Sequence, residues 1–109
     1  MIQLTVLYGQ PQDPAAFDRY YRETHVHVAR KMPGIKGYTT NKPVSLNPQE
    51  PSSYYLIADL YFENMPALQA ALQSPEGQAA AGDVQNFATG GAQLLVGEIQ
   101  VYDPVSIGA

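Results

Sequence analysis

The chain has 109 residues, the length of one domain, and 45% of them are hydrophobic while 15% are charged. This composition excludes an intrinsically disordered segment. Six basic against ten acidic residues leave a net charge of −4, and without a basic cluster neither nucleic acid nor a membrane surface is expected as a partner. The absence of cysteine excludes disulfides, thiolate nucleophiles and cysteine-ligated metals, and favours a cytoplasmic location. Neither a signal peptide nor an apolar run of about 20 residues is visible.

The N-terminal third predicts a strand followed by a long amphipathic helix. Residues 2–8 alternate with a period of two, so Tyr8 shares one face with the aliphatic residues before it. Asp13 and Pro14 suit the N-cap and the first turn of a helix, which is expected to run to Lys31 and to end before Pro33-Gly34. The apolar stripe of this helix consists of Phe17, Tyr21, Thr24, Val28 and Met32.

The rest of the chain predicts three more strands around a helical region. In chain order we expect an edge strand over 35–43, a loop over 44–53, a central strand over 54–62 with both faces covered, a short helix capped by Asn64, a second helical segment from Pro75 to about Asn86, a last strand over 93–102 and a tail from Pro104.

This order of elements predicts an α+β fold, the ferredoxin-like split βαβ, in which a four-stranded antiparallel sheet carries its helices on one face. Residues 1–109 are interpreted as a single domain. The third and fourth strands carry large apolar side chains at both odd and even positions, as at Leu56 and Ile57 or Leu94 and Leu95. Because such a patch is typical of a partner surface, we expect a homodimer with facing sheets, and a cleft between each sheet and its helices.

The two histidines, His25 and His27, are the first candidates for chemistry because the unperturbed imidazole is the only side chain with a pKa near neutrality. On a helix they point about 200° apart, so a shared metal ion is not expected. His25 lies at the shoulder of the apolar stripe. One interpretation is a half-solvated residue bonded to a carbonyl, and the other is a general acid or base tuned by a carboxylate. Asp59 and Asp83 are the candidate carboxylates, although Asp59 could also face solvent.

Tyrosine is unusually frequent, with eight Tyr against three Phe and no Trp. Tyr8, Tyr21 and Tyr38 are candidate binding residues because a phenol suits an amphipathic pocket. The alternative is ordinary β-propensity, which also favours tyrosine in strands. The chain has no phosphate-binding loop and no serine-nucleophile elbow.

Two segments resemble the EthD family. The first runs from Tyr20-Tyr21 through Thr24-His25 to Lys36-Gly37-Tyr38, and the second is Asp83-Val84-Gln85-Asn86-Phe87. The chain departs from the family pattern at His27 and at Gln85, where proline is usual. The residue that carries over is His25, and the second segment adds Asn86 and Phe87 to Asp83 as candidate binding residues.

The resemblance implies a dimeric α/β-barrel of a kind encoded beside an ether-degrading cytochrome P450 system. Related barrels act without cofactors on small, flat, apolar substrates. We therefore expect a small hydrophobic or aromatic ligand and cofactor-free isomerisation, cyclisation or oxygenation through His25, with no metal. The alternatives are a non-catalytic ligand-binding or accessory protein, and a purely structural dimer module without a useful cleft.

Overall fold

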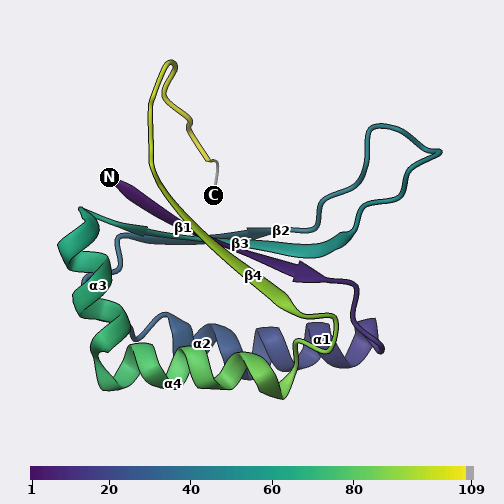
Figure 1. Ribbon diagram of the computed structural model, residues 1–109, viewed down its shortest axis with the longest axis horizontal. Helices are drawn as coiled ribbons and strands as arrows, with labels where there is room; N and C mark the ends of the chain where they lie inside the picture. The colour runs from purple at the N-terminus through teal and green to yellow at the C-terminus, as the bar shows by residue number, and fades with distance from the viewer. Residues whose placement is uncertain (108–109) are drawn as a thin grey trace.

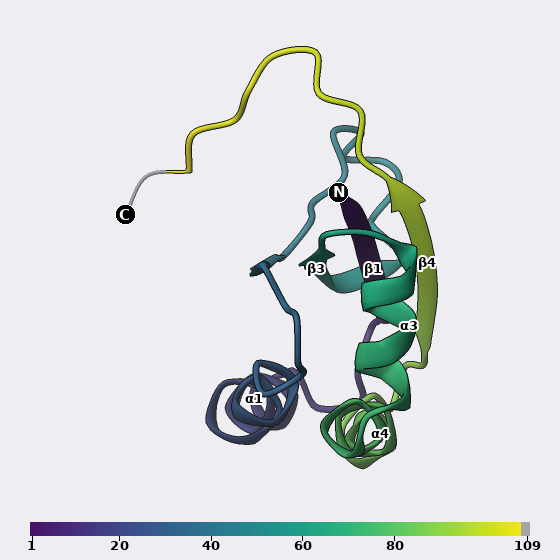
Figure 2. The ribbon, with the colours of Figure 1, turned by 90° about the vertical axis from the view of Figure 1, so that its left-hand side faces the viewer.

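The computed structural model describes residues 1–107, which form a sheet with all helices on one side (Figure 1). The two long helical stretches lie side by side beneath the sheet (Figure 2). The elements are β1 (Ile2–Gly9), α1 (Pro14–Tyr20), the π-helical turn η1 (Tyr21–His25), α2 (Val26–Ala29), β2 (Gly37–Asn41), β3 (Tyr54–Phe62), α3 (Met65–Gln73), α4 (Pro75–Asp83), the 3₁₀ turn η2 (Val84–Asn86) and β4 (Ala92–Glu98).

The strands are antiparallel in the order β2-β3-β1-β4, so the predicted ferredoxin-like fold is confirmed. β3 is central and β2 is an edge strand, as expected. Alternate residues of β1 and β3 point toward the helices and are buried, because strand side chains alternate between faces. These inward residues are Leu4, Val6 and Tyr8 from β1, and Leu56, Ala58, Leu60 and Phe62 from β3.

Both faces of β3 were expected to be covered. Within a single chain this prediction is wrong, because only the face toward the helices is covered. Ile57, Asp59 and Tyr61 lie on the face that carries no helices and are partly exposed. We call this side of the sheet the open face. It also carries Leu95, which lies beside Thr5 in the register of β1 and β4.

The outer strands are shorter than predicted. β4 ends at Glu98 rather than at 102, because its neighbour β1 begins at Ile2 and the Ile99 amide already reaches the Met1 carbonyl. β2 spans only 37–41, and proline at position 43 cannot donate to a ladder. The chain after β4 rises over the open face (Figure 1); residues 108 and 109 of the predicted tail lie outside the described residues.

The first helix is not the regular α-helix over 14–31 that the sequence pattern predicts. It passes through the π-helical turn η1, where the Val26 amide donates to the Tyr21 carbonyl five residues earlier, and it ends at Ala29. In a regular α-helix every step of four residues overshoots a full turn by about 40°. The wider π turn rotates less per residue and offsets this drift. A row of residues four apart is therefore buried together: Phe17, Tyr21, His25 and Ala29.

Candidate functional site

A cavity of about 60 Å³ lies between the sheet and the helices. This space corresponds to roughly four to six water molecules. Its lining is apolar apart from three phenols and one imidazole. The polar lining residues are Tyr8 from β1, Tyr21 and His25 from η1, and Tyr38 from β2.

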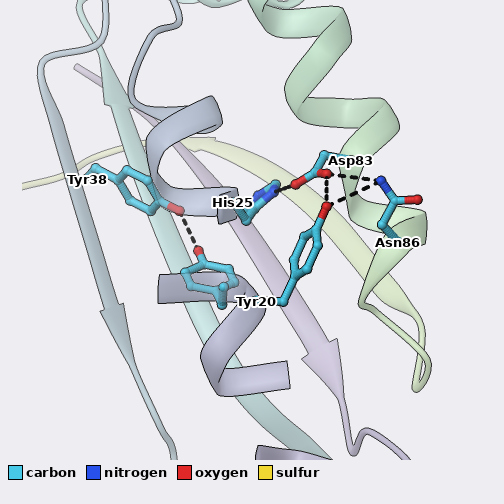
Figure 3. Close-up of polar contacts among 6 residues, drawn as sticks. Tyr20, His25, Tyr38, Asp83 and Asn86 are labelled. Carbon is cyan, nitrogen blue, oxygen red and sulfur yellow. Dashed lines mark hydrogen bonds and ion pairs between the residues drawn. The ribbon is translucent and has the colours of Figure 1, made fainter. Parts of the chain in front are cut away.

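His25 is buried, with 4% of its surface exposed, and it is not the half-solvated shoulder residue that one interpretation of the sequence predicts. The π turn accounts for the difference, since it brings His25 into line with Tyr21 on the buried face. Its Nδ1 lies 2.9 Å from Oδ2 of Asp83, the last residue of α4 (Figure 3). His27 is exposed, so the two imidazoles face different surroundings.

Asp83 is held by three side chains. Besides contacting His25, it accepts a hydrogen bond from the Tyr20 hydroxyl and one of 3.0 Å from Asn86 Nδ2 (Figure 3). Burial raises the pKa of Asp83, but the hydrogen bonds from Tyr20, His25 and Asn86 outweigh burial and leave the pKa below its usual 3.8. Asp83 is therefore a carboxylate at neutral pH.

A carboxylate beside Nδ1 fixes the tautomer of the neutral imidazole, because only an N–H can donate to it. The proton then sits on Nδ1, and Nε2 carries a lone pair. Nε2 makes no hydrogen bond within residues 1–107. Every fully buried side-chain nitrogen or oxygen in that range has a partner, so Nε2 is not fully buried. Because His25 lines the cavity, Nε2 is an available base at its wall.

The pKa of His25 determines how pH affects stability. Burial lowers this pKa below 6.5, and the hydrogen bond and charge of Asp83 oppose the shift only in part. The unfolded chain therefore binds a proton at pH values where folded His25 is still neutral, and the free energy of unfolding falls as the pH decreases below 6.5. The depressed pKa of Asp83 adds a further loss below pH 3.8.

We expect urea unfolding from about pH 7.5 to about pH 4.5 to show a shallower acid decline in His25→Asn than in wild type. His27→Asn is the matched control, since its side chain is exposed on the same helix. Equal declines in wild type and His25→Asn would contradict the depressed pKa.

The tyrosine hydroxyls form a second polar group. Those of Tyr21 and Tyr38 are hydrogen-bonded to each other at 2.5 Å. Burial raises the pKa of Tyr8, Tyr21 and Tyr38 above the usual 10.0. All three are therefore neutral phenols that can donate a hydrogen bond.

The remaining predicted site residues do not line the cavity. Phe87 packs its ring against His25 at a centroid distance of 4.7 Å and supports the imidazole from outside. Asn86 reaches Asp83 from the exposed side. Asp59 is the clear departure, because it lies on the open face, where it accepts hydrogen bonds from Gln3 and Thr5. The even-odd alternation of β3 places it on the far side of the sheet from His25.

Sequence reasoning missed the contribution of Tyr20. Its hydroxyl bonds to Asp83, which lies 63 positions away along the chain. The residue is visible in the Tyr20-Tyr21 pair, but no local pattern signals a contact between two helices. Which tyrosine of the pair faces the cavity depends on the π turn.

Residues 9–91 match the model of the EthD domain. The chain belongs to the EthD family. It is 45% identical, over 95 residues that cover 87% of this chain and 91% of the relative, to an 11.0 kDa protein of the thcB-thcC intergenic region of Rhodococcus erythropolis. An EthD family protein from Bacillus halodurans superposes with a TM-score of 0.85 at 35% identity, covering 92% of this chain and 99% of that one.

More distant structures share the fold alone. A dimeric ferredoxin-like protein from Thermobifida fusca has a TM-score of 0.67 at 11% identity, with 90% of each chain covered. A hydroxynitrile lyase from Passiflora edulis has a TM-score of 0.69 at 13% identity, covering 94% of this chain and 97% of the lyase. Across residues 1–107, no helix is both long and apolar enough to cross a membrane.

Proposed function

We propose that this EthD domain binds a small, largely apolar molecule in the cavity and transfers a proton to or from it through His25, without a cofactor. The observation that carries the proposal is the arrangement of the imidazole, whose Nδ1 is engaged by Asp83 while Nε2 remains available beside the cavity. A base that is oriented and kept neutral in this way suits general acid–base catalysis. Cofactor-free isomerisation, cyclisation and oxygenation can each begin with such a proton transfer.

The size of the cavity limits the ligand. Pockets for drug-sized molecules are about 300–1,000 Å³, whereas this cavity measures about 60 Å³. Leu72 and Leu94 line it and are partly exposed, so their side chains can yield to a ligand more readily than the buried residues of the lining. We therefore infer a ligand of about four to seven non-hydrogen atoms. The hydroxynitrile lyase is a precedent for an enzyme on this fold.

The alternative is a non-catalytic accessory protein. It is favoured by the Rhodococcus relative, which is named only for its place between thcB and thcC, and by the ethyl tert-butyl ether named for the Bacillus halodurans protein. A carrier for products of ether degradation would bind a ligand in the same cavity and leave it unchanged. Loss of a substrate signal over time separates this alternative from catalysis.

Filling the cavity tests whether it is the binding site. Ala58 is 1% exposed and lines the cavity, so Ala58→Leu places three more carbon atoms there. We expect ligand-observed NMR with butanone to lose its binding signal, at a cost in stability of about 1–3 kcal/mol from overpacking. Ala70→Leu on the exposed side of α3 is the matched control. Undiminished butanone binding by a folded Ala58→Leu variant would place the site elsewhere.

We also propose that a second copy of this chain covers the open face and the β4 edge. Leu94, Leu95 and Val96 are each about half exposed on β4, and an uncovered hydrophobic edge strand is a site of pairing between chains. Asp59 suits burial under a partner, because Gln3 Nε2 and Thr5 Oγ1 already donate to it at 2.9 and 2.7 Å.

Leu95→Glu is expected to dissociate this dimer, because it places a charge in the contact without touching the cavity. Analytical ultracentrifugation should give twice the chain mass of 11.9 kDa for wild type and a single mass for the variant. Leu46→Glu, in the fully exposed loop, should stay dimeric. A wild-type chain that sediments at 11.9 kDa at concentrations of about 100 μM would refute the dimer.

A further inference from the structure

Tyr8 carries a hydroxyl that the fold leaves unused. Its ring is 1% exposed and packs edge-on against Phe17 and Tyr21. Within residues 1–107 its oxygen makes no hydrogen bond. Every fully buried side-chain oxygen in that range has a partner, so the Tyr8 oxygen is not fully buried. Because Tyr8 lines the cavity, its hydroxyl opens into that space. A polar group that meets an otherwise apolar cavity has unsatisfied bonding capacity, which a ligand can satisfy.

The Tyr21–Tyr38 pair supplies a second unused donor. Its single hydrogen bond uses the proton of one phenol, so the other phenol keeps its O–H. Both residues line the cavity. The three phenols therefore offer two spare O–H donors, and His25 Nε2 offers the lone pair of a base in the same cavity.

We propose that the hydroxyls of Tyr8 and of the Tyr21–Tyr38 pair bind the oxygen of a small enolisable ketone or aldehyde while His25 removes the proton from its α-carbon. This substrate class rests on the function proposed above and deepens it. The α C–H bond breaks, the proton moves to Nε2, and the electron pair forms a C=C bond while the carbonyl π electrons move onto oxygen. The two phenols stabilise the resulting enolate, and return of a proton to carbon or oxygen completes the exchange.

Charge favours a neutral carbonyl compound over a carboxylic acid. The lining contains neither lysine nor arginine, and the nearest ionised group to His25 is the Asp83 carboxylate. A ligand that arrives as an anion would therefore be repelled and unpaired. A ketone enters neutral and gains negative charge only when His25 becomes positive, so the net charge of the site stays constant.

Exchange of the α-hydrogens of butanone for deuterium in D₂O, followed by NMR, tests the proposal. Tyr8→Phe keeps the packed ring and removes one donor, and we expect the exchange rate to fall about 10²–10³-fold. The Tyr21–Tyr38 pair predicts an unusual pattern. Tyr21→Phe or Tyr38→Phe frees the hydroxyl of the remaining phenol, so each single variant retains one spare donor and its exchange rate should fall less than about 10-fold. The double variant should lose about as much as Tyr8→Phe. Tyr54→Phe, exposed at the start of β3, is the control.

The outcomes separate the two proposals. Exchange by wild type no faster than by His25→Asn overturns the proton-transfer function, and with it the assigned substrate class. Exchange that requires His25 but is unchanged in Tyr8→Phe and in the double variant overturns the role of the phenols and leaves the function standing. As a second measurement, wild type should bind butanone more tightly than its hydrocarbon isostere 2-methyl-1-butene by about 3–10-fold. Equal affinity would also overturn the phenol site.

Discussion

Replacing His25 by asparagine is expected to lower the rate of proton transfer by about 10²–10⁴-fold, the usual effect of removing a general acid–base group. Tyr20 and Asn86 still donate to Asp83 in this variant, and asparagine keeps a hydrogen-bonding group on the side of the carboxylate that His25 contacted. The variant should therefore remain folded. The measurement is the first-order rate constant for deuterium incorporation into butanone under saturating conditions.

Two further variants locate the effect at the cavity. His27→Asn removes the exposed imidazole of the same helix and should keep the wild-type rate. Asp83→Asn removes the charge that favours the Nδ1–H tautomer and that opposes the fall in the pKa of His25, so the base becomes weaker and less well oriented. We expect it to be slower than wild type with its acid limb shifted to lower pH. A His25→Asn variant at the wild-type rate would exclude His25 from the chemistry.

Replacing Phe87 by alanine is expected to destabilise the chain by about 3–5 kcal/mol, as for other fully buried phenylalanines. Phe87 is 5% exposed and contacts a ring on almost every side. Centroid distances from Phe87 range from 4.7 to 5.6 Å for the rings of Tyr8, Phe17, Tyr20, Tyr21 and His25. Alanine would leave a void that these rings, fixed on β1 and the first helix, cannot all move to fill.

Urea unfolding measures this loss, and Phe87→Leu should recover most of it because leucine fills much of the space. Tyr102→Ala, at a position that is 91% exposed, should change the free energy of unfolding by no more than about 0.5 kcal/mol. A loss below about 1 kcal/mol in Phe87→Ala would mean that the aromatic cluster adds little to the core.

The fold was predictable because its signals are local. The alternation over residues 2–8, the Asp13 and Asn64 caps and the helix start at Pro75 each act within a few residues, and the structure contains these features. Whether the open face is covered could not be predicted from one strand. Odd-position apolar side chains such as Ile57 lie on the open face and stay partly exposed, so their pattern bears on a second molecule.

The site was predictable in its residue types and only partly in its geometry. His25, Asp83 and three of the tyrosines were candidates in the sequence, and the structure places His25 and those tyrosines at one cavity, with Asp83 against the imidazole. Asp59 was placed with them because periodicity does not tell which face of a sheet meets the helices. The burial of His25 depends on a local departure from α-helical rotation, and its contact with Asp83 spans 58 positions. Neither is encoded in spacing along the chain.

The π-helical turn at Tyr21–His25 also affects how related sequences should be aligned around His25. A turn closed by bonds of five residues accommodates one residue more than its α-helical counterpart, so shortening the chain there by one would let the helix rewind. The helical residues after the turn would then rotate about the helix axis, and a different side chain would occupy the position of the imidazole. When a family member lacks the π-helical turn, its sequence should therefore be aligned to this one with a one-residue gap in this helix. A histidine placed opposite His25 by an alignment without that gap would not be its equivalent.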